Sequence, residues 1–371
     1  MAPSGRISQS VFDGSRLRVI LLLDLYEGAQ QQFLDAYELM RRQVASVPGH
    51  ISDQLCQSIE NPSQWLITSE WESAPPFLAW VNSEEHVETV KPMHSCVRDT
   101  RSMRYSVLRE TNPEQPQPVV PAHTQVEARV GDGVARHALT FTVKPGSESK
   151  VAEILSGYQS PSAQVDENTR LRRTSLFMHG NRVVRAVEVE GDLLAALRHV
   201  ARQPEVRAVE EAINPYLEQD RDLTDPDSAR VFFTRAALPA VQHVVADRPA
   251  PAGLRRHALY YPAKEGRGTD LARLLAHQDR DAAGDPGNPV YGSTVFQRDD
   301  IVVRLIDVVG EPDLDALASL GLKGAGKATE LERLLDGPAI GVEGSLDTER
   351  NVNRLLSHID MLPVTDRTAT P

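Results

Sequence analysis

Hydrophobic positions in the middle of the chain alternate with polar ones and then change to helical spacing. In "RHALTFTV", residues 136–143, apolar and polar side chains alternate as in a strand with one buried face. The following "SESKVAEILSGYQ" has the spacing of an amphipathic helix. Two more strands, "RRTSLFM" and "RVVRAVEV", flank the residues "HGN", which suit a tight hairpin. A Leu- and Ala-rich helix and a short final strand follow. This order predicts a ferredoxin-like unit, an antiparallel sheet with helices on one face.

The same pattern occurs again further along the chain. "RHALYYPAKEG", residues 256–266, repeats "RHALTFTVKPG", residues 136–146, at a spacing of 120 positions (256 − 136). The later "VVR" strand also recurs, with Arg185 matched by Arg304 at a spacing of 119 (304 − 185). A match at both ends of so long a unit predicts a duplicated domain rather than an array of short repeats.

The N-terminal part has the same order of predicted strands and helices but a different amino-acid sequence. Strands are expected at "RLRVILLLDL", "HISDQLCQSI" and "QWLITSEW", with a helix whose apolar stripe comprises Phe33, Tyr37, Met40 and Val44. The sequence therefore predicts an α+β chain of three ferredoxin-like (β-α-β-β-α-β) units, at residues 16–110, 133–223 and 253–365. Proline-rich linkers at 111–125 and 248–253 separate the units.

Each such unit leaves one sheet face without helices, and that face has to be buried. Two units that pair sheet to sheet form a barrel-like core, and an interior that side chains do not fill is a ligand cavity. Three units predict one pairing within the chain, as in dimeric α+β barrels, and one with a second molecule. A homodimer is therefore expected.

Composition narrows the classes of partner and compartment. The chain has 52 acidic and 40 basic residues, a net charge of −12, which disfavours nucleic acid and anionic membranes as partners. The first residues lack the apolar core of a signal peptide, and only Cys56 and Cys96 occur, expected as reduced thiols. These features predict a cytoplasmic protein. No histidine or cysteine spacing typical of a metal site is present, so no metal is expected.

Two families are similar to parts of this sequence. "DQLCQSIENPSQWLITSEWESAPPFLAWVNSEEH", with Trp80-x-x-Ser83-x-x-His86, resembles the antibiotic biosynthesis monooxygenase domain. The repeated "RHAL" and "VVR" strands resemble the SchA/CurD-like domain, which occurs in actinomycete clusters for aromatic polyketides and spore pigments. The resemblance implies a monooxygenase that oxidises a polycyclic aromatic polyketide, an anthrone-type ring, to a quinone or hydroxylated product. It implies O₂ as co-substrate without flavin, haem or metal, and other tailoring enzymes as possible partners.

Two other functions fit the same features. An aromatic polyketide cyclase would use the cavity to fold a poly-β-ketone and guide aldol closure. A non-catalytic protein would bind intermediates among other tailoring enzymes.

Candidate site residues in the first unit are aromatic side chains and histidines. Trp65 and Trp71 share one strand face, where they either line an aromatic pocket or fill the core. His86 is the candidate base, because a histidine titrates near neutral pH and could take a proton from a phenol or ring CH₂; otherwise it caps a helix. Trp80 and His50 are candidate substrate-binding residues. Quinone-forming members often carry Asn where this chain has Ile67.

Candidate residues in the repeated units are two arginines and two histidines. Arg185 and Arg304 lie at equivalent points within apolar strands, where a cation is costly unless it is paired or faces a wet cavity. They either bind a phenolate or enolate oxygen or form buried ion pairs, with Asp307 or Glu188 as expected neighbours. His137 and His257 begin equivalent strands and are further substrate-binding candidates.

Overall fold

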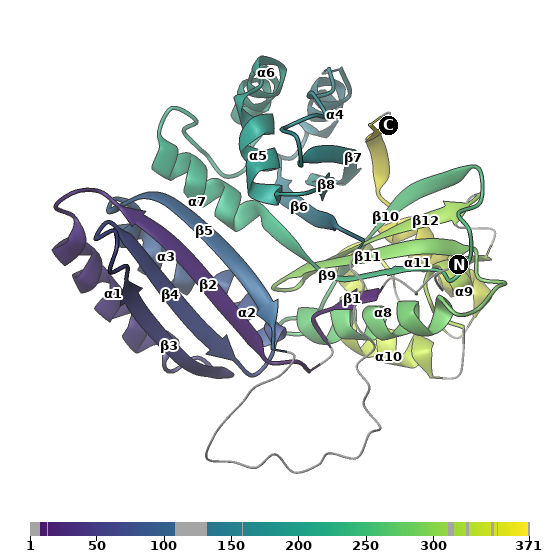
Figure 1. Ribbon diagram of the computed structural model, residues 1–371. Helices are drawn as coiled ribbons and strands as arrows, with labels where there is room; N and C mark the ends of the chain where they lie inside the picture. Colours follow the sequence, from purple (N-terminus) through teal and green to yellow (C-terminus); the bar gives the residue numbers. More distant parts are fainter. Residues whose placement is uncertain are drawn as a thin grey trace, which may run out of the picture. The chain divides into compact units, whose positions relative to one another are not determined.

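The structure is a computed structural model, which describes residues 8–12, 14–107, 132–157, 159–310, 315–323, 326–342, 345–346 and 348–369. The chain divides into two compact units, which are shown in Figure 1 and described separately. The N-terminal unit spans Val11–Arg129, and the C-terminal unit comprises Met1–Ser10 and Val130–Pro371. The linker expected at residues 111–125 lies outside the described residues.

The N-terminal unit is the predicted ferredoxin-like fold. Its described elements are, in order, β2 (Leu17–Leu25), α1 (Gln30–Val44), β3 (His50–Gln57), β4 (Gln64–Trp71), α2 (Ala74–Val81), α3 (Glu84–His94) and β5 (Val97–Ser106). The sheet has the order β3-β4-β2-β5, and every neighbouring pair is antiparallel. The predicted stripe of α1 packs on this sheet through Phe33 and Tyr37.

The C-terminal unit contains both copies of the duplicated domain. The first comprises β6 (Val134–Thr142), α4 (Glu148–Gly157), β7 (Arg170–His179), β8 (Arg182–Glu190), α5 (Leu193–Arg202), α6 (Pro204–Ile213), α7 (Pro226–Ala236) and β9 (Ala237–Val245). The second comprises β10 (Leu254–Pro262), α8 (Gly268–Ala282), β11 (Val290–Arg298), β12 (Ile301–Val309), α9 (Ala316–Ser319), α10 (Lys327–Leu334), α11 (Glu349–Ile359) and β13 (Leu362–Thr368). The hairpin turns match as well, because Gly180 and its equivalent Asp299 (299 − 180 = 119) both have positive φ, 53° and 50°.

The two copies exchange their last strands. In the nine-stranded sheet, whose main path is β10-β12-β11-β9-β6-β8-β7-β13, β9 pairs with β11 of the second copy and β13 with β7 of the first. A single bridge, between Leu259 of β10 and Asp360, brings the two ends of the sheet together. The short strand β1 (Ser8–Ser10) pairs with β9. The sheet is therefore a nearly closed barrel, and the predicted pairing of two units within the chain is confirmed.

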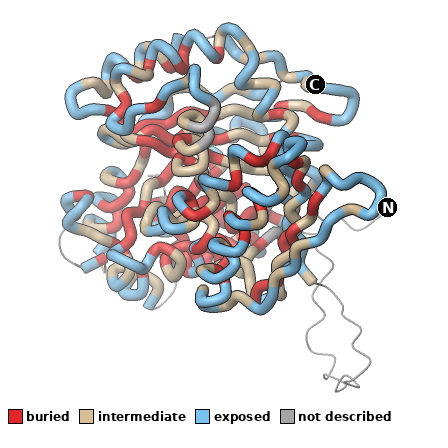
Figure 2. Tube along the Cα trace, turned by 90° about the vertical axis from the view of Figure 1, so that its left-hand side faces the viewer, coloured by how far each residue is buried: buried red, intermediate tan, exposed pale blue. Residues whose placement is uncertain are grey.

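The barrel has an interior shared by both copies and an outer face covered by helices. Phe177, Val184, Phe296 and Val303 belong to one cluster, so residues of both copies meet inside the barrel. Residues of opposite parity, such as Val183, pack outward against the helices. Figure 2 shows buried residues along the strands and exposed ones along much of the helices.

Two further sequence predictions can be compared with the structure. Cys56 and Cys96 are free thiols, as expected. Within the part of the chain that the structure describes, no helix has the length and apolar character needed to span a bilayer.

Candidate active site

Aromatic rings gather where β3 and β4 of the N-terminal unit meet α2. His50, the first residue of β3, lies opposite Trp71, the last residue of β4, with ring centroids 5.1 Å apart and an interplanar angle of 73°. Phe77 of α2 contacts the same indole edge to face at 5.5 Å. Trp71 is only 1% exposed, and its Nε1–H donates to Ser69 Oγ at 3.0 Å. His50 therefore lies against a fixed aromatic wall.

His50 also continues a chain of polar groups. The hydroxyl of Tyr37 donates to Asp53 Oδ2, and Asp53 Oδ1 lies 3.7 Å from His50 Nε2. Burial and the Asp53 carboxylate raise the pKa of Tyr37 well above its ordinary value, so Tyr37 remains a donor. The His50 side chain is 6% exposed, and among the described residues its Nε2 has no hydrogen-bond partner. Asp53 therefore lies between the hydroxyl of Tyr37 and the ring of His50.

The second histidine, His86, lies against Trp80. Their ring centroids are 5.1 Å apart. His86 is in the first turn of α3, where its backbone N–H donates to the N-cap Ser83 Oγ at 3.1 Å. Burial, with a smaller contribution from His94, lowers the pKa of His86 to about 4. Its Nδ1 is buried and has no hydrogen-bond partner within the described chain. His86 is therefore a neutral imidazole at pH 7, and its buried Nδ1 is free of hydrogen bonds to the described residues.

Trp65 does not join these rings. It lies six residues from Trp71 on β4, roughly 20 Å along a strand. Its ring contacts Phe33 of α1 at 5.6 Å, and its Nε1–H donates to the Pro62 carbonyl at 3.0 Å. Trp65 thus fills the core between α1 and the sheet.

The repeated arginines lie on the helix-covered face of the C-terminal unit. Arg304 is 1% exposed and donates to both carboxylate oxygens of Asp279 on α8, at 3.1 Å and 2.5 Å. Arg185 pairs with Glu210 of α6, which also accepts from Arg221 at 2.7 Å. Arg304 is therefore a member of a buried ion pair and Arg185 of a partly buried one.

The expectation that Asp307 or Glu188 would pair with these arginines was wrong. Asp307 and Glu188 have the opposite strand parity and face the barrel interior, where both pair with Arg256. The true partners come from helices, which a strand pattern does not locate.

The repeated histidines also point away from the barrel interior. His137 shares the strand face of Leu139 and Phe141, which pack under the helices of the first copy. His257 has the equivalent parity, and its Nδ1 lies 3.8 Å from Asp360 Oδ1.

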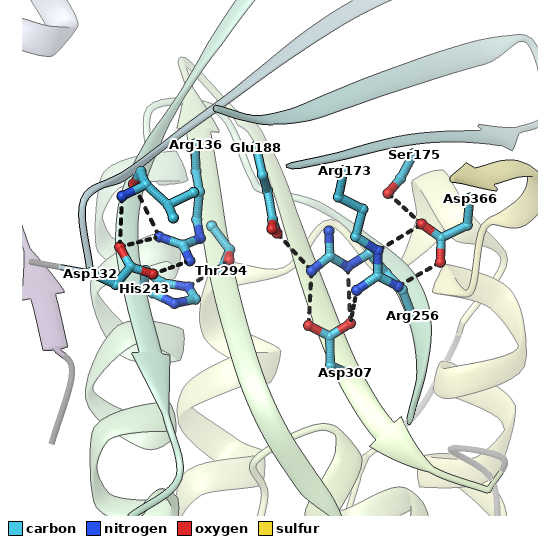
Figure 3. A network of polar contacts seen from close by, with 11 residues as sticks. Asp132, Arg136, Arg173, Ser175, Glu188, His243, Arg256, Thr294, Asp307 and Asp366 are labelled. Carbon is cyan, nitrogen blue, oxygen red and sulfur yellow. Dashed lines mark hydrogen bonds and ion pairs between the residues drawn. The ribbon is translucent and has the colours of Figure 1, made fainter. Parts of the chain in front are cut away.

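Charged residues inside the barrel form a network that the sequence did not indicate (Figure 3). Arg256 donates to Asp307 at 3.0 Å and 2.8 Å and lies 2.7 Å from Glu188. We call the following set the interior network: Asp132, Arg136, Arg173, Ser175, Glu188, His243, Arg256, Thr294, Asp307 and Asp366. One feature of the sequence fits this network: arginines recur at equivalent inward positions of both copies, as Arg136 and Arg256, and so do acids, as Glu188 and Asp307. Among the described residues, no three His, Cys, Asp or Glu side chains are grouped as for a metal ion.

Comparison with known proteins places the chain in a family. The model of the antibiotic biosynthesis monooxygenase family matches residues 16–92, and that of the SchA/CurD like domain matches residues 134–246. The chain is 67% identical over 369 residues to the polyketide synthase CurD of Streptomyces cyaneus, covering 100% of this chain and 99% of that protein. It is 60% identical to protein SchA of Streptomyces halstedii, covering 98% of this chain and 96% of that protein.

A third relative and two solved structures add to the comparison. The 42.8 kDa protein in the whiE locus of Streptomyces coelicolor is 63% identical, over 98% of this chain and 91% of that protein. SnoaB, a cofactor-independent oxygenase from Streptomyces nogalater, is 13% identical over 27% of this chain and 99% of its own, with a TM-score of 0.25. A putative antibiotic biosynthesis monooxygenase from Nitrosomonas europaea is 15% identical over 27% of this chain and 98% of its own, also with a TM-score of 0.25. Residues 16–92 match the antibiotic biosynthesis monooxygenase family, and the chain as a whole belongs to the SchA/CurD family.

Proposed function

We propose that this protein is a monooxygenase that oxidises an aromatic polyketide intermediate with O₂, and that the reaction takes place in the N-terminal unit. The family match of residues 16–92 supports the reaction class, and the similarity to the polyketide synthase CurD supports a polyketide substrate. The observation that carries the proposal is a pair of buried ring nitrogens, His50 Nε2 and His86 Nδ1, beside Trp71 and Trp80, neither of which has a hydrogen-bond partner among the described residues.

The proposed chemistry begins with removal of a proton from an anthrone CH₂. The resulting carbanion or enolate transfers an electron to O₂, and the radical pair combines to a peroxide at the same carbon. Loss of water then leaves a carbonyl, so that CH₂ and O₂ become C=O and H₂O. The substrate is the only reductant, so the step itself requires no flavin, haem or metal. Burial of the reacting groups by the surrounding rings protects the anion from water.

We assign the two histidines different roles. His50 is the base, because Asp53 at 3.7 Å stabilises the imidazolium that proton transfer creates. The sequence favoured His86 for this role, but a pKa of about 4 makes His86 a weak base. His86 instead hydrogen-bonds a substrate oxygen, and Trp71 and Trp80 contact the flat ring.

Oxygen uptake with the anthrone dithranol tests this proposal. We expect His50→Gln to lower the enzymatic rate by roughly 10²–10⁴-fold after subtraction of spontaneous oxidation. Cys56→Ser is the matched control, because Cys56 is exposed on the same strand and should leave the rate unchanged. Water loss from a poly-β-ketone without oxygen uptake would contradict the proposal and indicate a cyclase.

We also infer that the open sheet face of the N-terminal unit pairs with a second copy of the chain. Leu22 lies on this face, opposite to the helices, and is 41% exposed. Such a face needs a cover. Light scattering should give a dimer for the natural chain and a monomer for Leu22→Glu; a natural monomer would contradict the inference.

A further inference from the structure

The duplication gives the barrel interior two equivalent corners with different contents. Arg173 corresponds to Gly292, Ser175 to Thr294 and Glu188 to Asp307, each at a spacing of 119 (292 − 173, 294 − 175, 307 − 188). Asp366 of β13 pairs in register with Ser175, and His243 of β9 pairs in register with Thr294. Asp366 and His243, which both lie on exchanged strands, are therefore also equivalent.

The β7–β13 corner, comprising Arg173, Ser175 and Asp366, is fully paired. Arg173 bridges Asp307 at 3.0 Å and Asp366 at 2.8 Å and 2.5 Å. Ser175 Oγ donates to Asp366 Oδ1 at 2.8 Å. No buried side-chain atom of these residues lacks a hydrogen-bond partner. This corner is closed by its own side chains.

The β9–β11 corner contains Asp132, Arg136, His243 and Thr294, which Figure 3 shows, together with Gly292 of β11, and its hydrogen bonding is incomplete within the described chain. Thr294 Oγ1 contacts His243 Nδ1 at 2.9 Å, as Ser175 contacts Asp366 in the other corner. Gly292, however, has no side chain where Arg173 has a guanidinium. Arg136 pairs with Asp132 at 2.5 Å, and Glu188 turns away to Arg256. His243 Nε2 and Arg136 Nε are buried without a partner in the described chain.

Two buried polar groups in one corner, Arg136 Nε and His243 Nε2, keep hydrogen-bonding capacity that a ligand could use. An unsatisfied buried donor or acceptor is costly, and such groups are rare in folded proteins. His243 is only 7% exposed. Thr294 faces it from β11, Arg136 from β6, and Asp132 from the segment just before β6. The fully paired equivalent corner shows that this barrel can satisfy such groups with its own side chains.

Charge and neighbouring residues define the chemical class of the ligand. Burial, with a contribution from Arg136, lowers the pKa of His243 to about 3, so the imidazole is neutral. Arg136 is balanced by Asp132, and the whole interior network has more carboxylates than arginines, which disfavours an anion. Two positions further along the strands the inward residues are apolar, Ala138 after Arg136 and Phe296 after Thr294. A suitable ligand is uncharged, carries oxygen and has an apolar body.

We propose that the β9–β11 corner is a second binding site, which takes a neutral phenolic or enolic ring. Arg136 Nε–H donates to one ring oxygen, and His243 Nε2 hydrogen-bonds a neighbouring hydroxyl or carbonyl. The ligand enters from the polar end of the barrel, where the side chains of Asp132 and Glu188 are 16% and 19% exposed. The site is independent of the oxidation proposed for the N-terminal unit.

The variant Gly292→Arg tests this site, because it introduces the arginine that the closed corner has at the equivalent position, Arg173. An added Cβ at Gly292 would meet Asp307 Oδ2 at 3.5 Å, an ordinary contact, and the new guanidinium would enter a network with excess carboxylate. His243→Phe is the second variant, in case Gly292→Arg does not fold. Ser175→Thr is the control, because it introduces the equivalent residue in the closed corner.

Binding of 2,3-dihydroxynaphthalene, whose two neighbouring hydroxyls match the two proposed contacts, separates this site from the N-terminal one. All three tryptophans, Trp65, Trp71 and Trp80, belong to the N-terminal unit, so quenching of their fluorescence reports binding there. Calorimetry should reveal an additional binding event without quenching in the natural chain and in Ser175→Thr. This event should weaken about tenfold or more in Gly292→Arg and His243→Phe. Absence of that event in the natural chain, or its persistence in both variants, would overturn the proposal, whatever the result for oxygen uptake.

Discussion

Replacement of Arg304 by Met should destabilise the C-terminal unit strongly. The Asp279 side chain is 2% exposed, and Arg304 supplies hydrogen bonds to both of its oxygens and to the Ser319 carbonyl. Removal of one partner of a buried pair leaves an uncompensated charge and costs about 3–5 kcal/mol. Arg185→Met should cost less, roughly 1–2 kcal/mol, because Glu210 keeps its bond to Arg221.

Urea unfolding, followed by two probes, measures this effect. Far-ultraviolet circular dichroism reports both units, whereas tryptophan fluorescence reports only the N-terminal one. The Arg304→Met shift should appear in the first signal and be absent from the second. The double variant Arg304→Met/Asp279→Leu should recover most of the loss, because an apolar pair often replaces a buried ion pair without cost. A loss below about 1 kcal/mol, or no recovery in the double variant, would refute a structural role for this pair.

Three other predictions follow from individual contacts. Asp53→Asn should lower the turnover of dithranol roughly 10-fold to 100-fold, because the imidazolium of His50 loses its carboxylate; an unchanged rate in oxygen-electrode assays would count against that role. The folded-state pKa of His86 is lowered from 6.5 to about 4, so its contribution to stability is complete above pH 6.5 and is lost as the pH falls toward 4. His86→Phe should therefore reduce the loss of urea resistance between pH 7 and pH 5, measured by tryptophan fluorescence, and an unaltered pH dependence would contradict this. Gly268→Ala should cost about 2 kcal/mol or more in thermal unfolding, because its Cβ would lie 1.8 Å from the Asp299 carbonyl oxygen; a wild-type melting temperature would contradict this contact.

The repeat was the most informative part of the sequence for the fold. The matches at both ends of the unit, Arg136 with Arg256 and Arg185 with Arg304, defined the copies. The hairpin at Gly180 recurs at Asp299 with the same backbone conformation. The exchange of β9 and β13 was not predictable, because the partner of a short strand is chosen by tertiary packing rather than by its own alternation.

The sequence predicted the residues of the candidate site less completely than it predicted the helices and strands. It indicated Trp71 and His50, but not the approach of Asp53 to His50. Residues three apart in a regular strand face opposite sides, and only the irregularity between His50 and Ser52 brings these two side chains to the same face. The helix partners Asp279 and Glu210 were missed for a similar reason, since strand parity defines a face but not the residue that covers it.

The source of the product oxygen tests the central proposal most directly. Purified protein, shown by its absorption spectrum to be free of flavin and haem, is given dithranol under ¹⁸O₂ in unlabelled water, and the product is analysed by mass spectrometry. The account predicts one ¹⁸O atom in the new carbonyl, formed rapidly by the natural chain and slowly by His50→Gln. Product oxygen that comes from water, or label incorporated no faster than without protein, would contradict oxidation of the ring by O₂ at this site.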